Sequence, residues 1–213
     1  MTDNQRTGKR KKRYQKVGSL QYRQNYYLIV TDTEKTEKNY IEGLKGSLPS
    51  EVRDKIVVRY VNEKTNNMVD KCLEVQRMDA QYRDAWIIFD KDEVDNFDQI
   101  ITSAERKGIS VAWSNPCIEI WFLAYFGRMP ITTGSVQCCN KLEDLYMKKT
   151  GRAYNKSDPN IYHMLNQYGD ETKAIQIAES KYKEFIKEIG SIPSRMNPSS
   201  TLFILVRELK RSN

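Results

Sequence analysis

The sequence predicts an α/β fold, with about four parallel strands flanked by helices, followed by a helical C-terminal half. Between residues 26 and 126, short β-branched apolar runs alternate with segments whose apolar residues recur every three or four positions. This alternation is typical of parallel βαβ units. Beyond residue 126 only the helical spacing remains. The chain has 213 residues, 39% hydrophobic and 30% charged, which is enough to bury a core without disulfides or metal.

Four apolar runs predict the strands of the sheet. Each run is short and ends abruptly at polar residues, as expected of buried parallel strands. The helices between them begin near acidic or capping residues, and Gly108 suits the C-cap of the third. The predicted strands cover residues 26–30, 56–61, 85–89 and 109–112, and the helices between them cover 34–45, 68–73 and 97–104.

The C-terminal half is predicted to consist of helices packed on the sheet. An apolar helix is expected over residues 115–126, with Ser114 or Asn115 as its N-cap and Pro116 at its first position. Further helices are predicted over 136–149, 171–189 and 198–210, with loops at 127–134 and 150–160. The predicted organisation is a flexible basic arm at 1–25, an α/β core at 26–126 and a helical region at 127–213.

The excess positive charge lies in the N-terminal arm. Residues 1–25 hold eight of the 35 basic residues and one of the 28 acidic ones, so the rest of the chain is electrically balanced. Such an arm would gain affinity for nucleic acid by releasing condensed counterions. A solubilising tail is the alternative, since charge runs are often simply solvated. The candidate contacts are Arg10, Lys11, Lys12 and Arg13, together with Arg152 and Lys156 in the 150–160 loop.

Acidic residues follow two of the predicted strands. Asp32, Glu34 and Glu37 come after the first strand, and Asp90 and Asp92 come after the third. Sites in open α/β sheets form at the carboxyl ends of strands, so we expect these acids to meet. Mg²⁺ prefers such oxygen ligands and would activate a phosphodiester or a water molecule. The alternative is that these acids only cap helices or lie in solvated loops.

The remaining reactive residues argue against several other site types. Cys72, Cys117, Cys138 and Cys139 form no CxxC pair, and His163 is the sole histidine. Neither a zinc site nor a disulfide framework is predicted, and a reducing cytoplasm is expected. We interpret His163 as a surface or partly buried residue, which leaves a nucleophilic triad without its base. Because the chain lacks an apolar run of 18 residues, no membrane association is expected.

Several segments resemble the RloB-like (AbiLii-like) proteins and, more distantly, the Toprim fold of topoisomerases, primases and overcoming-lysogenisation-defect nucleases. Residues 32–40 (DTEKTEKNY) resemble the family's EGEKTE-NY opening, and the strand ending FDKDE at 89–93 resembles the Toprim DxD segment. Residues 114–121 (SNPCIEIW) resemble SNPCFE-W, and 197–201 (NPSST) resemble a late helix start. The resemblance covers about residues 26–210.

This resemblance implies a Toprim-like core that binds Mg²⁺, with Mn²⁺ as a substitute, and cleaves nucleic acid. Asp32, Asp90 and Asp92 would hold the metal, and Glu34 and Glu119 would complete the catalytic set. The resemblance favours tRNA or other RNA over DNA as substrate. It also implies an effector of an anti-phage or abortive-infection system, encoded near an AAA/ABC-type ATPase partner. Homodimerisation is left open.

Two departures from the family pattern keep other functions open. Asp32-Thr33 stands in place of Glu-Gly, so a metal would sit closer to the backbone or Glu34 would substitute. Residues 124–126 read Ala-Tyr-Phe where the family has Leu-His-Phe, which removes a histidine. The alternatives are a non-catalytic nucleic-acid-binding or adaptor subunit and a metal-dependent phosphotransferase or nucleotide-processing enzyme.

Overall fold

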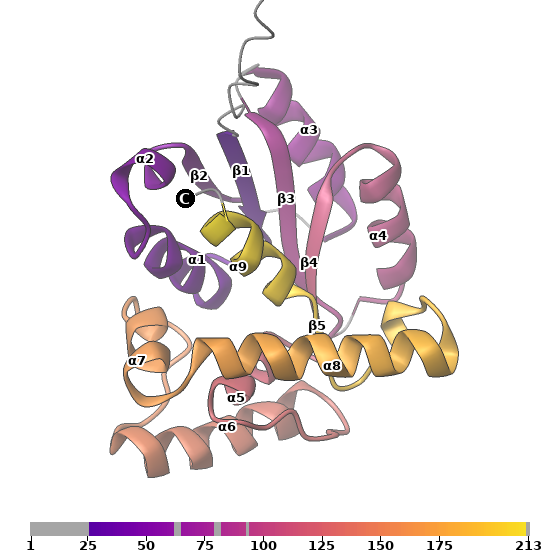
Figure 1. Cartoon of the computed structure of the whole chain (residues 1–213). Helices are drawn as coiled ribbons and strands as arrows, with labels where there is room; N and C mark the ends of the chain where they lie inside the picture. The colour runs from indigo at the N-terminus through magenta and orange to yellow at the C-terminus, as the bar shows by residue number, and fades with distance from the viewer. Residues whose placement is uncertain (1–25, 62–64, 79–81, 93, 212–213) are drawn as a thin grey trace, which may run out of the picture.

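A five-stranded sheet lies at the centre of the computed structural model, which describes residues 26–61, 65–78, 82–92 and 94–211. The strand order is β2-β1-β3-β4-β5 (Figure 1). The first four strands are parallel, and the short fifth strand is antiparallel to β4. The strands are β1 (Tyr26–Thr31), β2 (Ile56–Tyr60), β3 (Tyr82–Asp90), β4 (Ser110–Asn115) and β5 (Ser199–Ser200).

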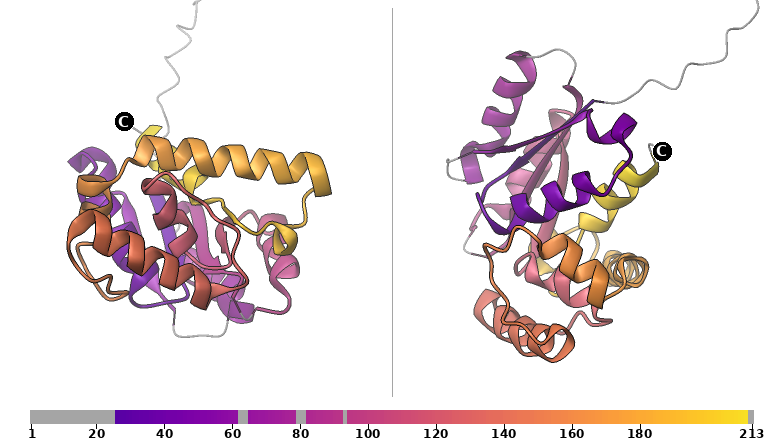
Figure 2. Two further views of the ribbon diagram at one scale, coloured as in Figure 1. Left: turned by 90° about the horizontal axis from the view of Figure 1, so that it is seen from below. Right: turned by 90° about the vertical axis from the view of Figure 1, so that its left-hand side faces the viewer.

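Helices cover both faces of this sheet. Alternate residues of a strand point to opposite faces, so in β1 Tyr27 and Ile29 belong to one apolar cluster and Leu28 and Val30 to the other. Figure 2 shows α1 and α3 on opposite sides of the strands. The first cluster includes residues of α1 (Thr36–Gly46), α2 (Ser50–Arg53) and α9 (Leu202–Arg211). The second includes residues of α3 (Met68–Met78) and α4 (Phe97–Arg106).

A third group of helices lies below the carboxyl ends of the parallel strands in Figure 1. The group consists of α5 (Glu119–Tyr125), α6 (Ser135–Thr150), α7 (Ile161–Tyr168) and α8 (Glu171–Ile189). Every residue of α5 is buried, and its apolar side chains join the same cluster as α1 and α9. The helical half therefore encloses the edge of the sheet at which the acids after β1 and β3 lie.

The α/β class and the four parallel strands are confirmed, whereas several C-terminal details differ from the prediction. The structure adds α2 and α7, which are too short to produce a clear apolar period. It also places β5 at the start of the predicted helix 198–210, so that α9 begins at Leu202. His163 lies on α7 and is exposed, in agreement with its interpretation as a surface residue. Within the described ranges, no helix is long and apolar enough to cross a membrane.

The prediction that Ser114, Asn115 and Pro116 begin a helix was wrong. Ser114 and Asn115 end β4 and pair with β5, and α5 begins only at Glu119. The Asn115 side chain donates to the carbonyl oxygens of Pro193 and Ser194, both at 3.1 Å. Pairing with a strand distant in the sequence therefore takes precedence over the local capping pattern.

Candidate metal centre

A cavity of about 470 Å³ opens at the carboxyl ends of β1 and β3. Lys156 is the one cation among the described residues that line it. The carboxylates lining the cavity are those of Asp32, Glu37, Asp90, Asp92 and Glu119. They come from the turn after β1, the start of α1, the end of β3 and the start of α5. The tertiary structure thus brings Asp32, Asp90, Asp92 and Glu119 together, as expected of acids at one edge of a parallel sheet.

Three carboxylate oxygens in this cavity lack a hydrogen-bond partner. Asp32 Oδ1, Glu37 Oε2 and Asp90 Oδ1 are all buried, and no donor group in the described part of the chain bonds to them, although the Glu37 and Asp90 carboxyls lie close enough to share a proton. The second oxygen of Asp90 accepts a bond from the Ile118 N–H at 2.9 Å, which holds this carboxylate at the start of α5. Burying an unpartnered charged oxygen is unfavourable, so such atoms indicate a missing ligand. The donor set, oxygens alone, fits a hard cation such as Mg²⁺.

Burial raises the pKa values of these three acids, and repulsion between charges adds to the shift for Glu37 and Asp90. Burial raises the pKa of Asp32 to about 7, although backbone N–H groups of Asp32 and Thr33 oppose the shift. Burial, and then the charge of Asp32, raises the pKa of Glu37 to about 8. Burial likewise raises the pKa of Asp90 well above its usual range, and the charges of Glu37 and Asp32 add to it. Without a cation, the cluster therefore retains protons near neutral pH.

Glu119 differs because its charge is compensated within the protein. Its side chain is 2% exposed, and Oε1 lies 3.1 Å from the Lys156 Nζ. The Tyr154 hydroxyl donates to the same oxygen at 3.1 Å. Burial by itself would raise the pKa of Glu119, but the positive charge of Lys156, together with hydrogen bonds from Cys117, from the Glu119 backbone and from Lys156, outweighs burial, and the pKa is lowered. Lys156 thus contacts an acid inside the cavity as well as being a candidate nucleic-acid contact.

Asp92 and Glu34 are both exposed, but only Asp92 lines the cavity. Asp92 Oδ1 accepts a hydrogen bond from Ser135 Oγ at 2.7 Å, next to the start of α6. Glu34 belongs to the turn before α1, because this helix begins at Thr36 rather than at residue 34. The structure therefore leaves Glu34 apart from the other candidate acids and places Glu37 among them.

Helical spacing places Glu37 on the buried face of α1, although this spacing alone does not separate it from Glu34. Glu37 precedes Tyr40, Ile41 and Leu44 by three, four and seven positions, which is the spacing of one helix face. These three residues are fully buried in the core. An acid that continues a buried apolar face lies inside the protein. Glu34 also lies seven positions before Ile41, but it precedes the helix, which begins only at Thr36.

The basic candidates fall into three groups. Arg10, Lys11, Lys12 and Arg13 lie outside the described residues. Arg152 is exposed, and its Nη1 lies 4.0 Å from the Met164 sulfur. It does not line the cavity. Only Lys156 belongs to it, and its backbone oxygen also accepts a bond from the Thr36 hydroxyl at 3.1 Å. That bond ties the 150–160 loop to the first turn of α1.

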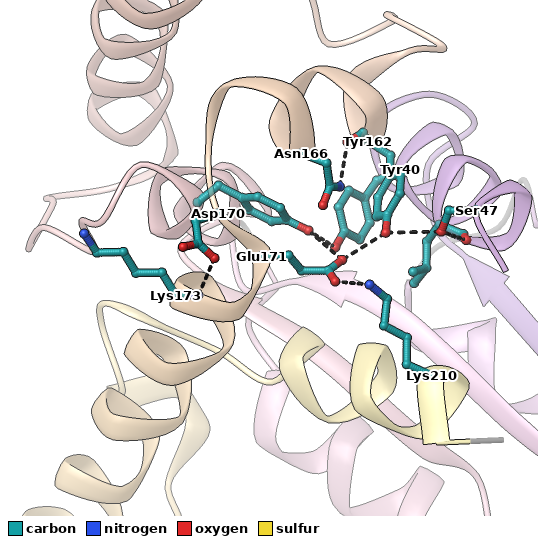
Figure 3. Close-up of polar contacts among 10 residues, drawn as sticks. Tyr40, Ser47, Tyr162, Asn166, Asp170, Glu171, Lys173 and Lys210 are labelled. Atoms are coloured by element: carbon teal, nitrogen blue, oxygen red, sulfur yellow. Dashed lines mark hydrogen bonds and ion pairs between the residues drawn. The ribbon is translucent and has the colours of Figure 1, made fainter. Parts of the chain in front are cut away.

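A further acid, Glu171, is largely buried at the start of α8 and has a partner on each carboxylate oxygen (Figure 3). The hydroxyls of Tyr125 and Tyr162 donate to Oε1 at 3.2 and 3.0 Å, and Lys210 pairs with Oε2. This network connects α5, α7, α8 and α9 beside an open cavity of about 650 Å³. Because its charge is compensated, the network is consistent with a structural role.

A family model described as RloB-like protein matches residues 27–209. No curated protein matched the chain in a sequence search. Among solved structures, the chain is similar to the C-terminal region of the Xanthomonas campestris pv. campestris OLD protein, with 15% identity and 88% of this chain covered. Three structures of that region, phased with iodine, platinum and mercury, have TM-scores of 0.35, 0.35 and 0.34 to this chain. The alignment with this chain covers 94%, 91% and 94% of their respective lengths. On the family match, which spans most of its length, the chain belongs to the RloB-like protein family.

Proposed function

We propose that this protein is a metal-dependent nuclease, of Toprim type, that cleaves phosphodiester bonds in the carboxylate cavity. The observation that carries the proposal is the set of unpartnered buried oxygens on Asp32, Glu37 and Asp90. Structural acids are normally bonded to donors, whereas acids that share a cleft and have strongly raised pKa values are typical of functional sites. An all-oxygen ligand set favours Mg²⁺, with Mn²⁺ as a substitute.

The protein's own residues would divide the work within the cavity. Asp32, Glu37 and Asp90 would hold the ion, and Asp92 would contribute from the open side. When bound there, Mg²⁺ would polarise the phosphodiester and lower the pKa of a water ligand. The Lys156 ammonium would stabilise negative charge that develops on the phosphate. Glu119 raises the pKa of Lys156 against the opposing effect of burial, so the ammonium stays charged at neutral pH.

We further propose RNA, with tRNA favoured, as the substrate. The excess positive charge of residues 1–25 supports a polyanionic substrate, because cationic arms bind nucleic acid by counterion release. The resemblance of the 114–121 segment to RloB-like proteins supports a role as a cytoplasmic effector of anti-phage defence. In this role the protein would act with an AAA/ABC-type ATPase encoded nearby.

The decisive experiment incubates the purified full chain with tRNA and with plasmid, in Mg²⁺, Mn²⁺ or EDTA. We expect cleavage of tRNA with either cation and none with EDTA. Asp90→Asn should lower the cleavage rate at least about 100-fold, because even residues that only orient metal ligands contribute 10–100-fold. Glu143→Gln, an exposed acid on α6, serves as the matched control. An Asp90→Asn protein as active as its parent would rule out the assigned site.

The shorter carboxylate of Asp32, in place of the family's glutamate, favours one alternative function. A non-catalytic adaptor would bind RNA in a gel-shift assay but would leave it intact at every metal concentration. Deleting residues 1–24 tests the binding step itself. We expect weaker binding and a flatter dependence of log K on log salt, because fewer phosphates are neutralised. An unchanged slope would identify the arm as a tail without a binding role.

A further inference from the structure

The cavity contains a second cluster of ligand atoms whose chemistry differs from that of the three unpartnered carboxylates. Cys117, Glu119 and Cys139 each contribute one ligand atom, and these atoms all lie within 4.8 Å of one another. Cys117 follows β4, Glu119 begins α5, and Cys139 lies on α6. Two sulfurs with one carboxylate oxygen form a donor set that suits Zn²⁺, whereas Mg²⁺ takes oxygen ligands alone.

The separations within this trio are close to those of a tetrahedral zinc site. With Zn–S of about 2.3 Å and Zn–O of about 2.0 Å, tetrahedral ligand atoms lie roughly 3.5–3.8 Å apart. From separations of up to 4.8 Å, the trio would have to close by at most about 1.3 Å. Cys139 is less buried as a residue than Cys117 and lies on α6, which is separate from the segment that carries Cys117 and Glu119. The buried Cys117 and Glu119 would supply the rigid part of the site.

A cation already lies at this cluster in the form of Lys156. Its Nζ lies 3.1 Å from Glu119 Oε1, and interactions with Glu119 and Cys139 raise its pKa although burial opposes this. The Lys156 side chain is 56% exposed, so the ammonium can move into solvent without unfolding the loop. The trio thus attracts positive charge, and the charge present is one that a metal ion can displace.

We propose that Cys117, Cys139 and Glu119 form a Zn²⁺ site within the carboxylate cavity, separate from the ligands assigned to Mg²⁺. The effect of this zinc site on cleavage, unlike zinc binding itself, rests on the proposed function. Zn²⁺ bound there would occupy Glu119 and exclude Lys156 from the cavity, so that it inhibits cleavage without replacing the ion at Asp32 and Asp90. Binding itself does not depend on any cleavage activity.

The binding test titrates the reduced, metal-free full chain with Co²⁺ and follows the absorption bands of thiolate-bound cobalt. We expect one Co²⁺ per chain, loss of the bands on adding Zn²⁺, and no effect of Mg²⁺. Cys139→Ser should weaken Co²⁺ binding at least about tenfold, since it removes one of three protein ligands. Cys72→Ala removes a thiol from α3, in the other apolar cluster, and should retain the bands.

Two results would overturn the zinc site: absence of cobalt–thiolate bands in the parent protein, or undiminished bands in Cys139→Ser. Glu119→Gln provides a second variant, in which the bands should shift because a ligand oxygen has changed, and unaltered bands would also count against the site. Circular dichroism establishes that each variant is folded.

The activity test adds Zn²⁺ to the Mg²⁺-dependent cleavage assay. We expect inhibition of the parent protein and at least about tenfold resistance in Cys139→Ser. A protein that binds Co²⁺ through thiolates but leaves nucleic acid intact would retain the zinc site and refute the proposed function. A protein that cleaves nucleic acid but shows no cobalt–thiolate bands would support the proposed function and refute the zinc site.

Discussion

Two buried acidic sites in this protein, the single acid Glu171 and the acids of the carboxylate cavity, differ in whether the protein supplies partners for their oxygens. Glu171, shown in Figure 3, has tyrosine hydroxyls on one oxygen and Lys210 on the other. In the carboxylate cavity, Asp32 and Asp90 each have a buried oxygen without any bonded partner. Burial of an acid is therefore not by itself a sign of function. What distinguishes the cavity is that buried oxygens of Asp32, Glu37 and Asp90 have no hydrogen-bond partner among the described residues.

The largest difference is expected between two glutamates near the start of α1. Glu37→Gln should lower Mn²⁺ affinity and cleavage at least about 100-fold, because it removes the negative charge and replaces one carboxylate oxygen of a proposed ligand with an amide NH₂. Glu34→Gln should change either quantity less than about threefold, because this side chain is exposed and outside the cavity. Isothermal titration with Mn²⁺ measures both variants. Equal effects would mean that the turn before α1 rearranges when metal binds.

The next effect is the pH dependence of stability that follows from the raised pKa values of two cavity acids. The folded-state pKa values of Asp32 and Glu37, about 7 and 8, lie above the ordinary values of 3.8 and 4.5. The folded state therefore holds protons that the unfolded state releases, so metal-free stability should fall as pH rises from about 4 to 8. Mg²⁺ at 100 times its Kd should restore about 2.7 kcal/mol at pH 8. Thermal melts in EDTA and Mg²⁺ at pH 5 and 8 measure both effects.

A smaller effect, on the free energy of unfolding, is expected from neutralising Glu171. Glu171→Gln should lower the free energy of unfolding by about 2 kcal/mol, because it weakens charged hydrogen bonds and leaves Lys210 without its ion pair. Asp90→Asn should cause no such loss in EDTA, since it removes repulsion instead. Urea unfolding of both proteins at pH 8 makes the comparison. Equal destabilisation would contradict the distinction between the clusters.

The smallest effect is expected at the N-cap of α8, immediately before Glu171. The Asp170 carboxylate accepts a bond from the Lys173 N–H at 2.9 Å (Figure 3). Asp170→Ala should lower the free energy of unfolding by about 1 kcal/mol, the usual contribution of an N-cap. Urea unfolding measures this loss, and cleavage should be unchanged. A loss as large as that of Glu171→Gln would mean that Asp170 also supports the charge network.

Spacing along the sequence does not reveal that Cys117 and Cys139 lie close together in the fold. Cys117 and Cys139 are far apart in the chain and have no histidine beside them, so their pattern did not predict a zinc site. The packing of α6 against α5 brings the two thiols to one wall of the cavity. Ligand sets assembled from separate helices leave no short motif in the sequence.

The sequence by itself determined the α/β class, the four parallel strands and the position of acids after two of them. These features follow from local apolar period and from the rule that parallel strands end at one edge of a sheet. Only the tertiary structure decided that Glu37 rather than Glu34 lies in the cavity, and that Lys156 pairs with Glu119 there. Both depend on where α1 begins and how the 150–160 loop packs, and such contacts between distant segments are not encoded in local patterns.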